Sequence, residues 1–138
     1  ITFILVKIKA FVFASIKKKI SIKKLSEKKR EFLASYIKDT CITYGVGEVS
    51  NEEIDKINIL NATMKAMNRA INEAYKKHSF DYLLIDGPNF KGYVPPGEDE
   101  DMIEYECVLQ GDSIYLSIAA ASIIATGFSV LIKSSTVF

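Results

Sequence analysis

A short apolar run that stops at a carboxylate is the feature that most constrains the fold of this chain. Residues 82–85 (Tyr-Leu-Leu-Ile) are all apolar, and Asp86 and Gly87 follow them directly. A continuous run of this length is typical of a strand buried on both faces, as in the sheets of α/β domains. The residue at the end of such a strand lies at the rim of the sheet, so Asp86 is a candidate site residue.

A second predicted strand ends near a second carboxylate. Residues 105–109 have β-type composition, Asp112 follows closely, and an Ala-rich helix begins at Ser113. Between the two strands, residues 88–104 hold three prolines and the acidic run Glu98–Asp101, which predicts a loop. The sequence therefore indicates two carboxylates that each lie just past a strand.

These two carboxylates can be explained in two ways. Asp86 and Asp112 at neighbouring strand ends could hold a hard divalent cation, because Mg2+ and Mn2+ prefer oxygen ligands. Phosphodiester hydrolysis uses such ions to activate water and to stabilise the leaving oxygen. Alternatively, Asp86 belongs to an ordinary Asp-Gly turn and Asp112 caps the following helix. Spacing alone favours the second explanation.

Upstream of these strands, the sequence predicts a helix and a further strand. Ser26 can cap a helix over Glu27–Asp39, where apolar residues recur at helical spacing among charged ones. The segment Thr43–Val49 contains β-type residues interrupted by Gly45 and Gly47. This pattern predicts a strand in close contact with other backbone.

Two more helices are predicted before residue 80. Ser50 and Glu53 have the spacing of a capping box, so a short helix begins there. A longer helix begins near Leu60, with an apolar stripe on one face and polar side chains on the other. The apolar stripe comprises Met64, Met67, Ile71 and Ala74, and Lys65, Arg69, Asn72 and Lys76 face outward.

The composition supports one folded domain. With 138 residues, of which 49% are apolar and 25% charged, the chain can bury a core, which excludes overall disorder. Its net charge of +1 provides no general attraction to nucleic acid. Cys41 and Cys107 have neither metal-ligand nor redox spacing, so we expect free thiols in a reducing compartment.

Two apolar stretches raise the question of a membrane. Residues 113–132 carry no charge and are long enough to span a bilayer, but their serines and alanines favour a packed helix of a soluble protein. Residues 1–22 are apolar and basic, yet their lysines lie within and after the apolar run, unlike those of a signal peptide. Their bias towards Ile, Lys and Phe would also arise from AT-rich DNA translated in an unintended frame. We therefore expect no membrane partner and a cytoplasmic protein.

Four strings follow one another along the chain: KKLSEKKRE at 23–31, YGVGEVSNEEIDKINILNATMKAMNRAI at 44–71, DYLLIDG at 81–87 and GDSIYLSIAAASIIA at 111–125. In this order they resemble ribonuclease HII, the type 2 ribonuclease H family. The resemblance implies an α/β, ribonuclease H-like fold with a mixed central sheet flanked by helices, incomplete at both termini. It also implies a Mg2+- or Mn2+-dependent endonuclease that cleaves the RNA strand of RNA–DNA hybrids and single ribonucleotides in duplex DNA.

Carried over residue by residue, the resemblance assigns four positions. Asp86 and Asp112 match catalytic, metal-binding carboxylates of the family, although the family's Lys-Gly-Asp motif reads Gln-Gly-Asp here. Lys23 and Lys24 match lysines that approach the nucleic-acid backbone, where cations bind phosphates. The alternative for these two lysines is a solvated approach to the helix that follows.

The chain departs from the family's pattern at both ends. The family begins with a strand bearing Asp-Glu-Ala-Gly-Arg-Gly, which supplies two further carboxylates and binds the ribose 2′-hydroxyl, whereas no Asp or Glu precedes Glu27 here. We therefore divide the chain into a divergent apolar and basic segment (1–22), a ribonuclease HII-like domain (23–126) and a divergent tail (127–138), and expect truncation or frame disruption at both ends. With two of four carboxylates, this polypeptide alone is expected to hydrolyse little or nothing.

Two hypotheses about function remain. The first is a ribonuclease HII endonuclease that acts on an RNA–DNA hybrid or on ribonucleotide-containing duplex DNA and needs no obligate protein partner. The second is a non-catalytic relative that acts as a weak nucleic-acid or protein binding module. Cleavage at a single ribonucleotide would support the first hypothesis, and salt-sensitive binding without cleavage would support the second.

Overall fold

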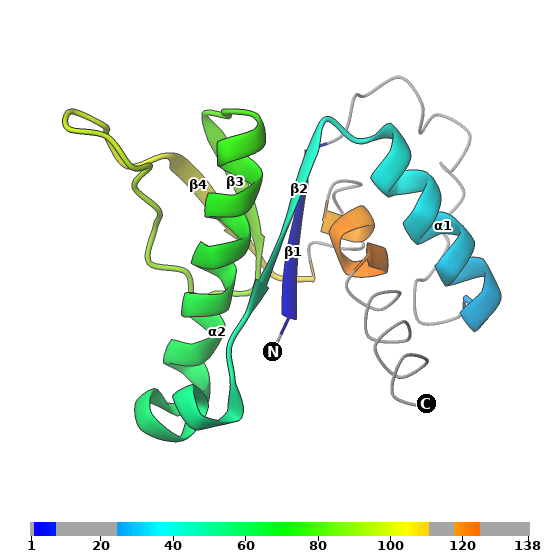
Figure 1. Cartoon of the computed structure of the whole chain (residues 1–138), viewed down its shortest axis with the longest axis horizontal. Coiled ribbons are helices and arrows are strands. Elements are labelled where there is room, and N and C mark those ends of the chain that lie inside the picture. The colour runs from blue at the N-terminus through cyan, green and yellow to red at the C-terminus, as the bar shows by residue number, and fades with distance from the viewer. Residues whose placement is uncertain (1, 8–24, 111–117, 125–138) are drawn as a thin grey trace.

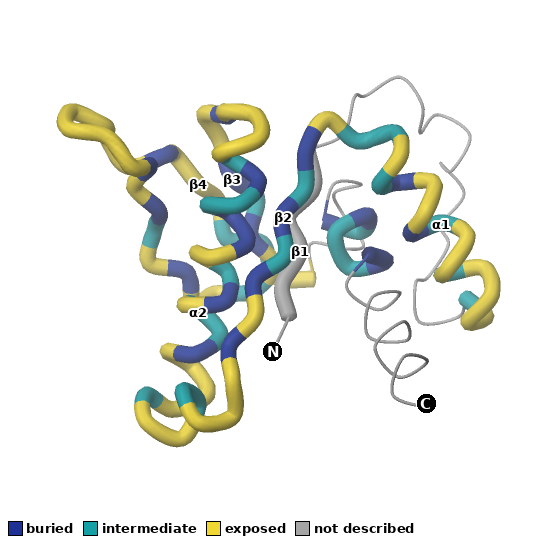
Figure 2. Tube along the Cα trace, in the orientation of Figure 1, coloured by how far each residue is buried: buried dark blue, intermediate teal, exposed yellow. Residues whose placement is uncertain are grey.

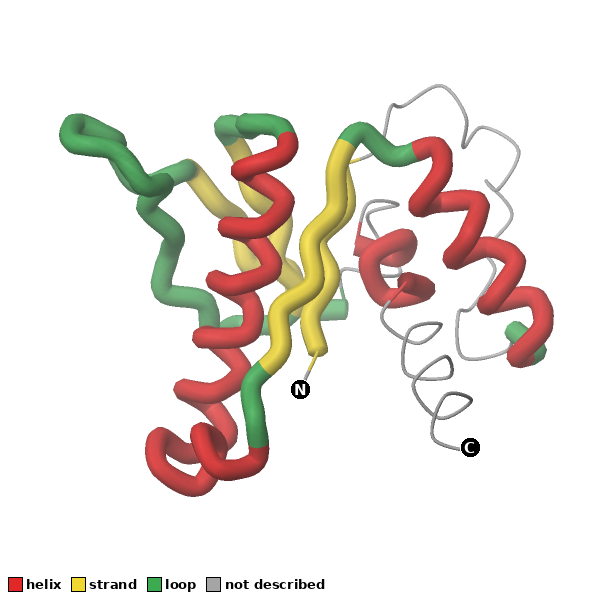
Figure 3. Tube along the Cα trace, in the orientation of Figure 1, coloured by secondary structure: helices red, strands yellow, loops and turns green. Residues whose placement is uncertain are grey.

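Helices and strands alternate along the chain, as the sequence predicts for an α/β protein. A computed structural model describes residues 2–7, 25–110 and 118–124, and for residues 2–7 it describes the backbone alone. Residues 118–124 are helical (Figure 3). The other elements, in chain order, are β1 (Thr2–Lys7), α1 (Glu27–Thr40), β2 (Thr43–Glu48), α2 (Asn51–Lys77), β3 (Tyr82–Asp86) and β4 (Glu104–Val108).

The strands pair two by two. β1 and β2 are antiparallel, with Lys7 opposite Thr43, and β3 and β4 are parallel, with Asp86 opposite Val108. Among the described residues the strands thus form two sheets of two strands each, where we expected one mixed central sheet.

Helix α2 lies directly against one face of β2 because two glycines allow it. A Cβ atom added to Gly45 would collide with the backbone of Ala70, and one added to Gly47 would collide with the backbone of Ala66. The close backbone contact predicted from these two glycines is confirmed. In Figure 1, α2 lies on one side of the β1–β2 pair, and α1 and the helical residues 118–124 lie on the other.

The opposite face of β2 packs against α1 and the helical residues 118–124. Tyr44 and Val46 alternate with the glycines, so they point away from α2. They contact a buried cluster on this side, and β2 is therefore covered on both faces, as Figure 2 shows. The buried members of the cluster are Ala34, Ile37, Ala120, Ile123 and Ile124.

Alanines, rather than methionines, form most of the buried face of α2. Besides Ile71, the fully buried residues occur at every fourth position: Ala62, Ala66, Ala70 and Ala74. The predicted stripe was correct for Ile71 and Ala74, but Met64 and Met67 are only half-buried. The reason is the short distance between the backbones of α2 and β2, which leaves no room for a long side chain there.

The two helices expected after β2 are confirmed, because α2 consists of two helical segments that meet at a kink at Asn58. Asn58 has φ 65° and ψ 166°, which is not helical, and its side-chain oxygen accepts a hydrogen bond from the Asn61 N–H (3.1 Å). The predicted capping box at the start of α2 is confirmed by reciprocal hydrogen bonds between Ser50 and Glu53, each 3.2 Å long. Ser26 occupies the N-cap of α1, but its side chain makes no capping hydrogen bond.

Three side chains of α2 cap the backbone edge of β2 that faces away from β1. We call Arg69, Glu73 and Lys77 the edge-capping residues, because each one binds a backbone group on this edge of the strand. Lys77 donates to the carbonyl of Tyr44 (3.1 Å), Glu73 accepts from the N–H of Val46 (2.9 Å), and Arg69 donates to the carbonyl of Glu48. These contacts occupy three of the backbone groups that an additional strand would need.

Two expectations from composition can also be compared with the structure. Cys41 and Cys107 are free, as predicted. Within the described ranges, no helix is both long and apolar enough to cross a membrane. Most of the apolar stretch 113–132 lies outside those ranges.

Candidate functional site

The first candidate site is the edge at which β3 and β4 end together. Asp86 is the last residue of β3 and is exposed, and Val108 is the last residue of β4 and lies opposite it. The N–H of Gly87 donates to the carbonyl of Val108 (2.9 Å), which extends the pairing by one residue. Because the strands are parallel, both chain segments leave the sheet at the same edge.

The chain turns shortly after the end of each of these two strands. Gly87 has φ 95°, a conformation that favours glycine, and Gln110 has φ 54°. The chain therefore bends sharply after each strand end. Asp112, the second predicted carboxylate, comes two residues after Gln110 but lies outside the described residues. The structure thus places Asp86 at the rim and does not test its proximity to Asp112.

The position of Asp86 is fixed by the packing of its strand. Leu83 and Ile85 are buried against Ile71 and Ala74 of α2. Side chains alternate along a strand, so Asp86 belongs to the face that points away from α2. A rigid apolar anchor beneath an exposed carboxylate is a suitable arrangement for holding a ligand at the rim.

Carboxylate oxygens at this rim suit a hard divalent cation, but the described residues supply only part of a metal site. No cluster of three or more His, Cys, Asp or Glu side chains that could hold a metal occurs within the described ranges. Asp112, the other predicted ligand, lies outside those ranges.

The other two predicted site residues, Lys23 and Lys24, lie outside the described residues. The acidic run Glu98–Asp101 is exposed in the loop between β3 and β4. The tip of that loop extends away from α2 and from the strands in Figure 1, so the acidic run does not cover them.

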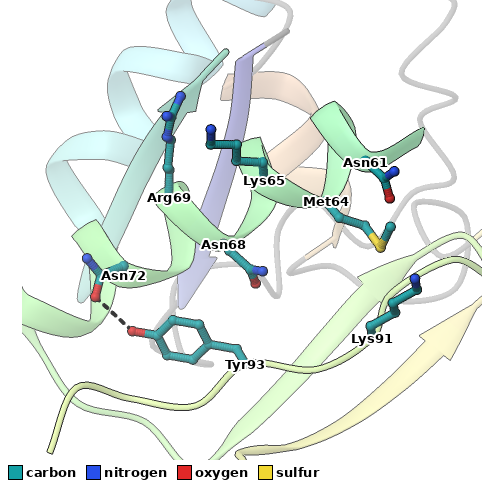
Figure 4. A pocket seen from close by; sticks show the side chains of 8 residues that line it. All are labelled: Asn61, Met64, Lys65, Asn68, Arg69, Asn72, Lys91 and Tyr93. Atoms are coloured by element: carbon teal, nitrogen blue, oxygen red, sulfur yellow. Dashed lines mark hydrogen bonds between the residues drawn. The ribbon is translucent and has the colours of Figure 1, made fainter. Parts of the chain in front are cut away.

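A second feature, which the sequence did not predict, is an open groove of about 580 Å3 on the outer face of α2. The groove lies between α2 and the part of the β3–β4 loop that contains Lys91 and Tyr93 (Figure 4). No acidic residue lines it. Its lining comprises Asn61, Met64, Lys65, Asn68, Arg69, Asn72, Lys91 and Tyr93. The sequence signal was the set of three asparagines on one helical face, which our prediction did not connect to the loop.

Tyr93 fixes the loop against the helix. Its hydroxyl donates to the side-chain oxygen of Asn72 (2.9 Å), and its ring is buried beside Tyr75, with ring centroids 6.2 Å apart. Burial, with a smaller contribution from Tyr75, raises the pKa of Tyr93 above its ordinary value. Tyr93 therefore stays a neutral hydrogen-bond donor at physiological pH.

The cations of the groove differ in their partners. Lys65 and Arg69 bind Glu53 at 2.6 Å and 2.8 Å, and in Figure 4 both point away from the loop. Arg69, followed by Lys65 and the N–H of Ser50, holds the pKa of Glu53 well below its usual range. Lys91 is exposed and forms no ion pair with any described residue.

Comparison with known proteins defines the class of the chain. A family model described as Ribonuclease HII matches residues 17–132. The chain belongs to the ribonuclease HII family.

Individual relatives are similar over three quarters of this chain. The Ribonuclease HII of Cytophaga hutchinsonii is 50% identical over 103 residues, which are 75% of this chain and 47% of that protein. The Ribonuclease HII of Christiangramia forsetii is 48% identical over 75% of this chain and 48% of that protein. The Ribonuclease HII of Clostridioides difficile is 50% identical over 75% of this chain and 36% of that protein. The chain thus spans about half the length of these relatives, or less.

Proposed function

We propose that this chain supplies part of the active site of a ribonuclease HII endonuclease, with Asp86 and Asp112 as its catalytic and metal-binding carboxylates. The observation that carries the proposal is the parallel pairing of β3 and β4, which end together with Asp86 at the rim. Family membership supports the reaction class, because relatives that are about 50% identical are named Ribonuclease HII.

The substrate in this proposal is an RNA–DNA hybrid or duplex DNA that contains a single ribonucleotide. The reaction is hydrolysis of a phosphodiester bond in the strand that contains the ribonucleotide. Lys23 and Lys24 are proposed to bind the phosphates of that substrate, because cations next to the nucleic-acid backbone provide most of the sequence-independent affinity. A cytoplasmic location belongs to the same proposal.

The proposed cofactor is Mg2+ or Mn2+, with Asp86 and Asp112 as protein ligands. When bound, such a cation activates water and stabilises the leaving oxygen. The contribution of Asp86 is a hard oxygen donor whose backbone is fixed by the pairing of β3 with β4 and by buried Leu83 and Ile85. A donor held this way needs no reorganisation of its strand before it binds a cation.

Catalysis by residues 1–138 alone is proposed to be weak. These residues contain no Asp or Glu before Glu27, so this part of the chain offers two of the four carboxylates that the family resemblance implies. Fewer anionic ligands lower the affinity for a divalent cation. Cation binding is therefore a more sensitive first test than turnover.

The experiment measures Mn2+ binding by titration calorimetry and, in parallel, nicking of a duplex with one ribonucleotide. Asp86→Asn and Asp112→Asn are each expected to weaken Mn2+ binding about tenfold or more, because each removes one anionic ligand. The matched control is Asp81→Asn, since Asp81 is exposed and precedes the same strand at its other end. Equal Mn2+ affinity in Asp86→Asn and Asp81→Asn would overturn the site. Nicking that survives both Asn substitutions would overturn the catalytic assignment.

A further inference from the structure

We infer that the groove on the outer face of α2 binds one nucleotide of a single-stranded nucleic-acid segment, at a place separate from the carboxylate rim. The inference rests on the groove itself and does not require catalysis by Asp86. The volume of about 580 Å3 lies within the range of roughly 300–1,000 Å3 that is typical of small-ligand sites. A single nucleotide is a ligand of this size.

The groove offers hydrogen-bonding groups that match a nucleobase. The side chain of Asn68 makes no hydrogen bond with another described residue. The side-chain nitrogen of Asn61 donates to the carbonyl of Ile57 (3.0 Å), and its oxygen remains available as an acceptor. A carboxamide donates and accepts at once, which is the arrangement that asparagine uses to pair with adenine.

The interior of the groove also has a surface on which a base can lie. In Figure 4, Met64 and Asn68 point from α2 towards the loop, and the ring of Tyr93 lies between the helix and the loop backbone. Met64 is half-buried, so part of its polarisable thioether stays exposed to a ligand. Tyr93 itself is buried, and its hydrogen bond to Asn72 holds the loop against α2, so the groove exists before a ligand arrives.

One cation in the groove is free to bind a phosphate. Lys91 extends from the loop towards the side chains of α2 in Figure 4, and no acidic residue lines the groove. Lys65 and Arg69 are already bound to Glu53. An acidic peptide would need several free cations for its carboxylates, whereas one phosphate beside a neutral base needs only one. The observations therefore favour a nucleotide.

The test uses the full chain in EDTA, so that divalent cations at the carboxylate rim cannot contribute. The probe is a fluorescein-labelled pentadeoxyadenylate, and its binding is followed by fluorescence anisotropy at several salt concentrations. Asn68→Ala and Lys91→Gln are each expected to weaken binding about fivefold, which corresponds to the loss of one hydrogen bond or phosphate contact. Lys91→Gln is also expected to reduce the slope of log affinity against log salt by about 0.7.

Controls separate this site from general electrostatic attraction and from the proposed enzyme. Lys76→Gln removes the same charge from an exposed position of α2 that does not line the groove, and it is expected to leave binding unchanged. Equal weakening by Lys76→Gln and Lys91→Gln would overturn the inference, as would the absence of binding in EDTA. Displacement of the probe by pentaglutamate as readily as by unlabelled pentadeoxyadenylate would assign the groove to an acidic peptide instead. Asp86→Asn is expected to bind the probe like the wild type, so failure of the carboxylate site is distinguishable from failure of the groove.

Discussion

Replacing Gly47 with Ala should destabilise the protein strongly, because the new methyl group has no space. A Cβ atom there would overlap the carbonyl oxygen of Ala66 and press on the backbone nitrogen of Ala70. Overpacking of a well-packed core costs about 1–3 kcal/mol. Since both contacts are with backbone, which cannot rotate away as a side chain can, we expect a loss of about 3 kcal/mol in the free energy of unfolding.

Urea unfolding followed by circular dichroism measures this loss. With a urea dependence of about 2 kcal/mol per M, 3 kcal/mol lowers the midpoint by roughly 1.5 M. The matched control is Gly87→Ala, because a Cβ at Gly87 would meet nothing within 4 Å and only its φ of 95° opposes the substitution. That conformational cost is about 1–2 kcal/mol, so the midpoint should fall by less than about 1 M. A smaller shift for Gly47→Ala than for Gly87→Ala would refute close packing of α2 on β2.

Three further predictions concern α1, α2 and pH. Ser50→Ala should lower the free energy of unfolding by about 1 kcal/mol, because the Ser50 side chain makes a capping hydrogen bond. Ser26→Ala should change it by less than about 0.5 kcal/mol, because the Ser26 side chain makes none. Thermal unfolding of both variants measures the difference. Asn58→Ala removes the cap at the kink and keeps the positive φ, so we expect the free energy of unfolding to fall by about 1–2 kcal/mol, measured by the urea midpoint. Asn58→Gly should lower it less, because glycine adopts a positive φ readily. For Glu73, burial opposes ionisation, but the hydrogen bonds from Lys77 and from the Val46 N–H outweigh it and place its pKa below the ordinary value of 4.5. Its contribution to stability is therefore present above pH 4.5 and is lost as the pH falls through its folded pKa, and Glu73→Gln should make the acid-induced decline in melting temperature shallower. An unchanged slope in that variant would contradict the assignment.

The sequence predicted those parts of the fold that depend on local chemistry. Ser50 and Glu53 stand three residues apart, and the resulting capping box is confirmed. Gly45 and Gly47 indicated a close approach of backbone, and α2 makes that approach. The run that ends at Asp86 is a strand whose last residue lies at a rim. In each case a short stretch of chain contains the physical cause of the structure.

Features that join distant segments could not be predicted in the same way. The pairing of β1 with β2 depends on residues about forty positions apart, and nothing local in either strand specifies the partner. The groove on α2 needs Lys91 and Tyr93 from a loop whose path depends on the aromatic core beneath it. From the sequence we assigned the buried face of α2 partly to methionines, because large apolar side chains usually form a core. The close contact between the backbones of α2 and β2 instead requires small side chains, so alanines form most of that face. The position of Asp112 relative to Asp86 remains a prediction.

Through the edge-capping residues, α2 forms hydrogen bonds with β2 that a neighbouring strand would otherwise form. The charges along the helix match the backbone groups along the edge of β2. Basic Arg69 and Lys77 each bind a carbonyl, and acidic Glu73 between them binds an N–H. A strand from another molecule finds these three groups already paired, so edge-to-edge addition of strands into dimers or fibrils is disfavoured at this edge. A mutation that reverses the charge at the middle position would leave an unpaired amide on β2 and place three cations side by side. Such a change would affect the solubility of the folded protein before it affected any chemistry at the carboxylate rim.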